Sequence, residues 1–228
     1  MENKLSKRGI SQLSKTLLFR VGKHRFGKVN IKDFIIDYNQ LLFSLQYVAN
    51  KICQHYGMAK YTPVITYQKL KNAGGCVNLN KSKEIYIDID TSQHYDKWQY
   101  ISIIAHEVAH KYLFIHDVYY EGLKNEFVTD AMAVYAGYGD IMRLGNLKVT
   151  KHTRNRDYRR NELGQMRPTY VEHFTKTHTL GYLLPWQIEF LQHCLNNDVI
   201  EVKLFSHYYY ILKPIPALIS LFKRTPKR

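Results

Sequence analysis

The chain has few of the features that mark secreted or membrane-spanning proteins. It holds three cysteines in 228 residues, an odd and widely spaced set that argues against a disulfide framework. No segment of signal-peptide type opens it. The most apolar run, residues 204–222, contains a histidine, a lysine and two prolines, which suit a membrane span poorly. We therefore expect a cytoplasmic protein without a transmembrane segment, with this run in the core or as a docked tail. Weak contact with a membrane surface is the alternative for this run.

Acidic residues are scarce, and the excess of positive charge is unevenly distributed. The chain has 33 Lys and Arg against 19 Asp and Glu, a formal net charge of +14. Residues 1–30 hold eight basic residues and one acidic residue, and residues 148–161 hold six and one. Clustered cations suit a nucleic acid or another acidic partner, the second cluster through Arg154, Arg156, Arg159 and Arg160. A solvated surface is the other interpretation, because no nucleic-acid motif accompanies the charge.

The chain shows no internal repeat and no low-complexity linker. Its length and its 45% hydrophobic content are enough for one sizeable core. We therefore expect a mobile basic N-terminal arm over residues 1–30, followed by a single domain over residues 31–228.

Apolar periodicity predicts a helix and then short strands in the first half of the domain. Residues 31–57 carry apolar positions at helical spacing and end on a glycine. The period then changes: residues 63–68, 76–80 and 84–90 resemble strands, the last alternating isoleucine with polar residues. The turn-like sequence between the last two predicts a hairpin.

The stretch AHEVAH, residues 105–110, lies in the middle of a second predicted helix. Asp96 and Gln99 have capping-box spacing, and apolar residues then recur to about residue 115. On such a helix His106 and His110 lie roughly 40° apart around the axis and about 6 Å along it. Both imidazoles can therefore reach one metal ion, and the geometry suits zinc.

A third predicted helix supplies the carboxylate that two histidines lack. Residues 125–137 are rich in alanine and glycine, which permits close approach to another helix. Glu126 and Asp130 lie one turn apart on it. Glu126 would complete a two-histidine, one-carboxylate set with a position left open, and Asp130 would accept the other ring N–H of His106.

The combination of His106-Glu107-x-x-His110 with Asn125-Glu126-x-x-x-Asp130 resembles the gluzincin, thermolysin-like class of zinc metallopeptidases. It is more loosely similar to the compact intracellular peptidases of the ImmA/IrrE type. The resemblance implies that His106, His110 and Glu126 bind Zn²⁺, that Glu107 is the general base and that Asp130 orients a ligand. Fifteen residues separate His110 from Glu126, fewer than in thermolysin, so the connection must be tighter.

The same resemblance implies an α+β, zincin-like fold: a small twisted mixed sheet packed on the AHEVAH helix, with further helices completing the domain. A peptide or protein substrate would lie in the groove and be hydrolysed by zinc-activated water. Val77 and Asn78, on a strand bordering the groove, would bind it through main-chain groups. The family tends to add a histidine or tyrosine that stabilises the oxyanion, and five residues qualify by type: His152, Tyr158, His173, His178 and Tyr182.

Two other interpretations remain open at this point. The chain would also fit a non-catalytic zincin-fold protein whose basic segments bind nucleic acid or an acidic partner, or a proteolytic regulator brought to its target by those segments. Glu107 favours an enzyme, because a structural zinc site needs no glutamate there and usually has four protein ligands. Cys76 fits either a small buried thiol or a thiolate that masks the metal.

Overall fold

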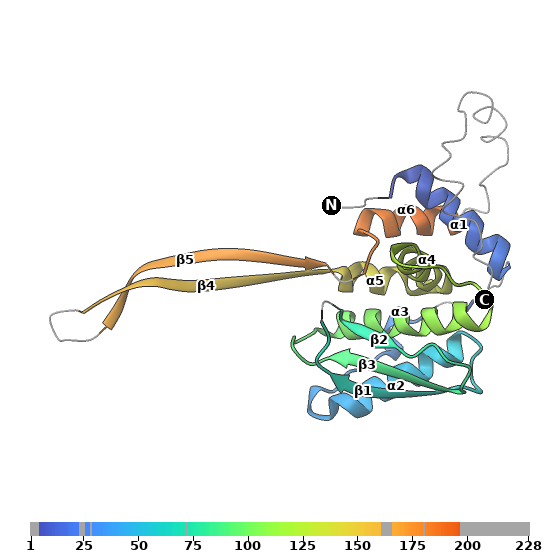
Figure 1. The fold of residues 1–228 in the computed structure, drawn as a ribbon, viewed down its shortest axis with the longest axis horizontal. Helices are drawn as coiled ribbons and strands as arrows, with labels where there is room; N and C mark the ends of the chain where they lie inside the picture. Colours follow the sequence, from blue (N-terminus) through green and yellow to red (C-terminus); the bar gives the residue numbers. More distant parts are fainter. Residues whose placement is uncertain are drawn as a thin grey trace, which may run out of the picture.

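A long buried helix forms the centre of the protein (Figure 1). The computed structural model describes residues 5–22, 26–27, 29–71, 73–160, 166–179 and 181–196, and for residues 147–179 it describes the backbone alone. The central helix, α3, spans Lys97–Ile115 and begins at a capping box in which Asp96 and Gln99 bond each other's backbone N–H. Its predicted bounds and cap are confirmed. Strands lie on one side of α3 and further helices on the other, so the mixed α+β class is confirmed.

The sheet on one side of α3 has three strands in the order β1-β3-β2. β1 (Thr62–Gln68) pairs in parallel with β3 (Glu84–Asp90), and β2 (Gly75–Val77) pairs antiparallel with β3. The sheet is therefore mixed, as predicted, and β2 and β3 form the expected hairpin. Ile85, Ile87 and Ile89 of β3 are fully buried, because alternate residues of a strand face the same side.

The helix that covers this sheet is shorter than predicted. α2 spans Leu41–His55, whereas the sequence predicted a helix from residue 31. Two 3₁₀ turns, Ile31–Asp33 and Tyr38–Gln40, occupy the remaining part. The side chains of Asn30 and Asp37 accept backbone N–H groups two residues ahead, and such local bonds compete with a continuous helix.

The N-terminal segment contains a packed helix where a basic arm was expected. α1 spans Lys7–Val21 and buries Ile10, Leu13 and Leu17. It lies along α6 (Pro185–Asn196) on the outer side of the helical layer (Figure 1). These three apolar residues share one face at helical spacing, so residues 7–21 belong to the common core, and the mobile-arm prediction is corrected there.

Three consecutive helical segments cover the other side of α3. α4 (Leu123–Ala133) leads into a π-helical turn, Val134–Tyr138, and then α5 (Gly139–Asn146). The bend falls at Gly137, whose φ of +94° suits a residue without a side chain. Ala131, Ala133 and Ala136 are fully buried, so the prediction of close helix packing by small residues is confirmed.

A long two-stranded hairpin leaves the body after α5. β4 (Leu147–Arg160) pairs antiparallel with β5 (Met166–Thr179), and the two strands project away from the body (Figure 1). The basic run 148–161 therefore falls almost wholly on β4. This hairpin was not predicted from the sequence.

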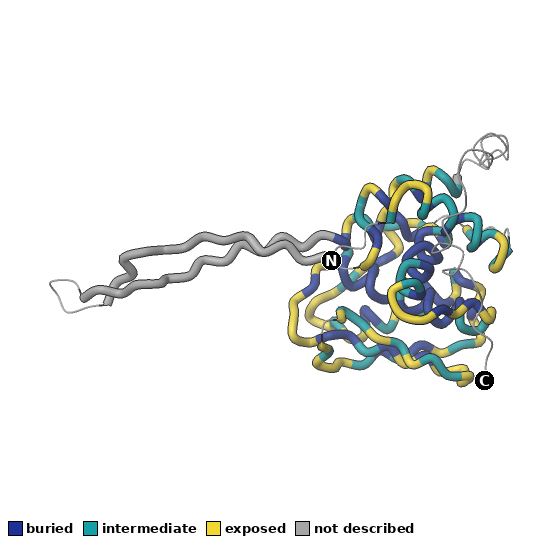
Figure 2. The backbone as a smooth tube through the Cα atoms, turned by 45° about the horizontal axis from the view of Figure 1, so that its top comes forward, coloured by how far each residue is buried: buried dark blue, intermediate teal, exposed yellow. Residues whose placement is uncertain are grey.

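Buried residues concentrate in the layer between the sheet and the outer helices (Figure 2). α3 contributes more of them than any other described helix. Among the described residues, no helix is long and apolar enough to cross a membrane. The apolar run 204–222 lies outside the described residues.

Candidate metal centre

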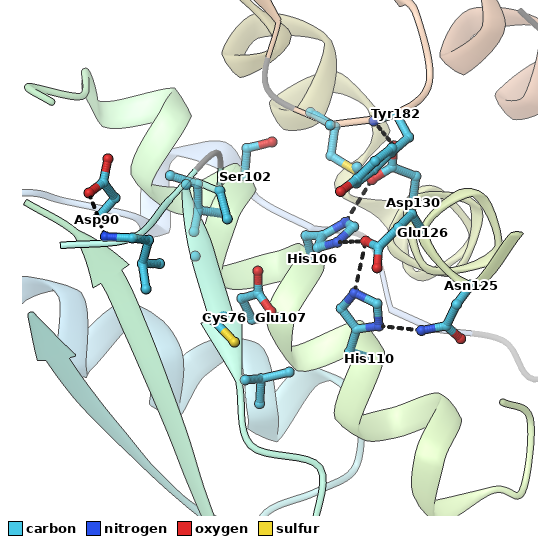
Figure 3. A pocket seen from close by; sticks show the side chains of 18 of the residues that line it. Cys76, Asp90, Ser102, His106, Glu107, His110, Asn125, Glu126, Asp130 and Tyr182 are labelled. Atoms are coloured by element: carbon cyan, nitrogen blue, oxygen red, sulfur yellow. Dashed lines mark hydrogen bonds and ion pairs between the residues drawn. The ribbon is translucent and has the colours of Figure 1, made fainter. Parts of the chain in front are cut away.

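Three side chains from α3 and α4 converge at one point (Figure 3). The Nε2 atoms of His106 and His110 lie 3.1 and 3.2 Å from the same carboxylate oxygen of Glu126. The two histidines are one turn apart on α3, and the tight packing of α4 brings Glu126 across to them. The structure thus brings together the three residues that the sequence predicted as ligands.

The Nδ1 atom of each imidazole, on the far side of the ring from Glu126, forms a hydrogen bond that orients the ring. His106 Nδ1 lies 2.7 Å from Asp130 Oδ1, as predicted. His110 Nδ1 lies 2.9 Å from the hydroxyl of Thr129, which itself donates to the carbonyl of Asn125. His110 Nδ1 also lies 3.2 Å from Nδ2 of Asn125, whose Oδ1 accepts the backbone N–H of Tyr120. These contacts orient both rings so that the two Nε2 atoms face Glu126. The role of Thr129 was missed, although its position one residue before Asp130 places it near His110.

Asp130 also fixes the chain that follows the hairpin. Its side chain is fully buried, and its Oδ2 accepts the backbone N–H groups of Tyr182 and Leu183 at 2.6 and 2.8 Å. Gly181, with φ of +87°, makes this turn, and a side chain there would approach the carboxylate at 3.3 Å. One carboxylate therefore links α4, His106 and the segment after β5.

The electrostatics of the group are those of tightly paired charges. Burial alone would lower the pKa of His106, but its bonds to Asp130 and Glu126 outweigh burial and raise the pKa to about 10. Burial would raise the pKa of Glu126, but the two histidines hold it at about 2. Glu126 is therefore ionised at neutral pH, the state in which a carboxylate binds a metal ion.

Glu107 lies beside the convergent group and is not part of it. It is 6% exposed, and burial raises the pKa of its carboxyl despite the opposing effect of the two histidines. β2 passes close to it, since a Cβ on Gly75 would lie 2.6 Å from a methyl of Ile103 and 3.0 Å from a Glu107 oxygen. Only glycine at this position lets the strand approach the helix so closely.

A cavity of about 1020 Å³ contains the group and Glu107. β2 and the preceding loop line one side, α3 forms the floor, and Glu126 and Tyr182 lie opposite. Its size is that of a site for a small ligand or a short peptide segment.

The two residues predicted to bind substrate through the main chain differ in whether their main-chain groups are available. Val77 lines the cavity at the edge of the sheet. The N–H of Asn78, however, donates to the carbonyl of Tyr86 inside the sheet, which corrects the prediction that it is available to a substrate. Main-chain groups alternate in direction along a strand, so the outward pairs of N–H and C=O belong to Gly75 and Val77.

Of the five residues that qualified as oxyanion stabilisers, Tyr182 lines the cavity. Its ring stacks on His106 with centroids 6.0 Å apart. Burial and the nearby carboxylates raise the pKa of its hydroxyl to about 12, so it stays protonated at neutral pH. The other four lie on β4 and β5, where the structure describes the backbone alone.

Cys76 lies on β2 and lines the cavity. Its thiol is exposed, which corrects the expectation of a buried thiol. Within the described part of the chain, the group suited to a metal consists of His106, His110 and Glu126 without Cys76. Its masking of the metal therefore finds no support in the geometry.

The donor set fits zinc. The two nitrogens and the oxygen lie within 4.8 Å of one another, and three ligands of a tetrahedral zinc ion are about 3.4 Å apart at the usual bond lengths. Nitrogen and carboxylate donors of this kind, with both histidines oriented through Nδ1, are typical of zinc sites. The structure thus contains a group able to bind a metal ion.

No protein-family model, curated protein or solved structure matches this chain.

Proposed function

We propose that the protein is a zinc-dependent peptidase in which Glu107 is the general base. One observation carries the proposal: a buried glutamate lies beside a two-histidine, one-carboxylate group in a cavity large enough for a peptide segment. A closed structural site usually has four protein ligands and requires no such neighbour. His106, His110 and Glu126 would hold the ion, and bound zinc supplies a Lewis acid that polarises a carbonyl and acidifies water.

The residues of the chain have separate roles in this proposal. Glu107 accepts a proton from the attacking water and delivers it to the leaving amine. Burial raises the pKa of its carboxyl, which favours the protonated form that returns the proton to the leaving amine. The Tyr182 hydroxyl donates to the carbonyl oxygen as negative charge develops there.

The substrate would be an extended peptide segment. The free edge of β2 offers the outward main-chain groups of Gly75 and Val77, which can pair with an extended chain as an added strand. Such pairing fixes the scissile carbonyl between Glu107 and Tyr182, on opposite sides of the cavity (Figure 3). A structure with a peptide bound away from β2 would contradict this placement.

Glu107→Gln tests the mechanism. The substitution keeps the volume and removes the base, so zinc content should stay near one per chain. Hydrolysis of a peptide library should fall by roughly 10²- to 10⁴-fold. His106→Ala should lose both zinc and activity. Zinc per chain and cleavage rate are measured on the same preparations.

The matched control is Glu121→Gln, which removes an exposed glutamate from the connection between α3 and α4. It should cleave as fast as the wild type. If Glu107→Gln keeps zinc and also cleaves at the wild-type rate, the proposed mechanism is wrong. A protein that only binds its partner would cleave no peptide, with or without Glu107.

A further inference from the structure

The β4–β5 hairpin is unlike the rest of the molecule in its distribution of charge. Its two strands hold eight Lys or Arg residues against two acidic residues. We divide it at the pair Arg154↔Glu172: the distal segment comprises residues 154–160 and 166–172, and the remainder is proximal. The distal segment contains arginines and no lysine. The proximal part contains lysines and no arginine. Arginine is the residue that best recognises phosphate.

In the strand register, one arginine of the distal segment, Arg154, has an acidic residue directly opposite it. Arg154 is opposite Glu172, but Arg159 is opposite Arg167 and Arg160 is opposite Met166. Like charges directly opposite each other destabilise a pair of strands. An anionic partner would remove this cost, and a solvated ribbon would not.

The shape of the hairpin points to one kind of polyanion. Each strand has 14 residues, which at about 3.4 Å per residue gives a length of roughly 45 Å, more than one turn of B-form DNA. A two-stranded ribbon fits the major groove of B-form DNA, about 12 Å wide. The major groove of A-form RNA is too narrow to admit it.

From the charge, register and dimensions of the hairpin, we propose that it binds duplex DNA through its distal segment. Binding is dominated by phosphate contacts and is therefore independent of base sequence and sensitive to salt. Asn146, directly before the hairpin, donates to the carbonyl of Leu183, shortly after it, at 2.5 Å. DNA on the ribbon is thus bound to the whole protein.

The test is fluorescence anisotropy of the full chain with a 30-base-pair DNA duplex, an RNA duplex of the same sequence and vesicles with anionic lipid. The duplex DNA should bind at least tenfold more tightly than the duplex RNA at low salt. The variant carrying Arg156→Gln, Arg159→Gln, Arg160→Gln and Arg167→Gln should bind DNA at least tenfold more weakly. Its slope of log K against log salt should be smaller by about 3 to 4.

The matched control removes four exposed lysines from the body, Lys60, Lys69, Lys81 and Lys83, each changed to Gln. It loses the same net charge and should bind DNA nearly as well as the wild type. Equal losses in the two variants would show that net charge alone binds DNA, which overturns the proposal. Equal binding of duplex RNA, or binding to vesicles without binding to DNA, would also overturn it. None of these measurements depends on peptidase activity.

Discussion

Asp130 does more than any other described carboxylate to organise the metal centre. It accepts from His106 on one oxygen and from two backbone N–H groups on the other. Removing its charge should leave the three ligands in place but loosen the orientation of His106. Asp130→Asn should therefore weaken zinc binding by about 10- to 100-fold, measured by competition with a chromophoric chelator.

Glu126→Ala supplies the comparison, because it removes a ligand and should cost more zinc affinity than Asp130→Asn. Asp140→Asn, an exposed aspartate on α5, should leave affinity unchanged. Full zinc affinity in Glu126→Ala, together with a loss in Asp130→Asn, would mean that the roles of the two carboxylates are reversed.

The sequence predicted the residues of this centre better than the contacts that surround and orient them. His106, His110, Glu126 and Asp130 lie at spacings that one helix face enforces, so the pattern alone identifies them. The contact of Tyr182 with His106 depends on a turn 52 residues after Asp130. The periodic spacing of residues within one helix or strand cannot predict a contact between positions so far apart in the sequence.

At the scale of elements, predictions succeeded where capping and apolar spacing agreed. α3 has both, and its bounds were predicted correctly. α1 has the spacing of Ile10, Leu13 and Leu17, but its many basic residues obscured the apolar face. The hairpin strands lack a clear apolar alternation, so their pairing could not be predicted from β-propensity.

The close approach of β2 to α3 gives a second prediction. Gly75→Ala places a methyl group against Ile103 and Glu107, so the strand or the Glu107 side chain must shift. Peptide hydrolysis should fall by tenfold or more, because a shift of about 1 Å near the reacting groups costs that much or more. Zinc content should remain near one per chain, since the atoms nearest to the new methyl group belong to Ile103 and Glu107 and not to a ligand.

Gly27→Ala is the control for this substitution, because a Cβ there meets no atom within 4 Å and the backbone is not in the left-handed region. It should keep wild-type activity. If Gly75→Ala cleaves peptides at the wild-type rate, β2 does not border the reacting groups as the cavity indicates.

For the whole molecule, the candidate metal centre lies between two helices at the middle of the core. His106 and His110 come from α3, which packs on the sheet, and Glu126 comes from α4, which packs on α1. A zinc ion that binds only the native state adds to the free energy of unfolding by mass action. At 100 times its dissociation constant, zinc should contribute about 2.7 kcal/mol.

For a domain of this size that free energy should raise the Tm by roughly 5–10 °C. The measurement is thermal unfolding with added zinc and after removal of metal by a chelator. Glu107→Gln should keep the full shift, because Glu107 is not a ligand, whereas His110→Ala should lose it. The two variants thus separate metal binding from catalysis in a property that needs no substrate. If zinc leaves the Tm of the wild type unchanged while remaining bound at one per chain, it does not distinguish the folded from the unfolded chain. The ion would then be bound elsewhere than between α3 and α4.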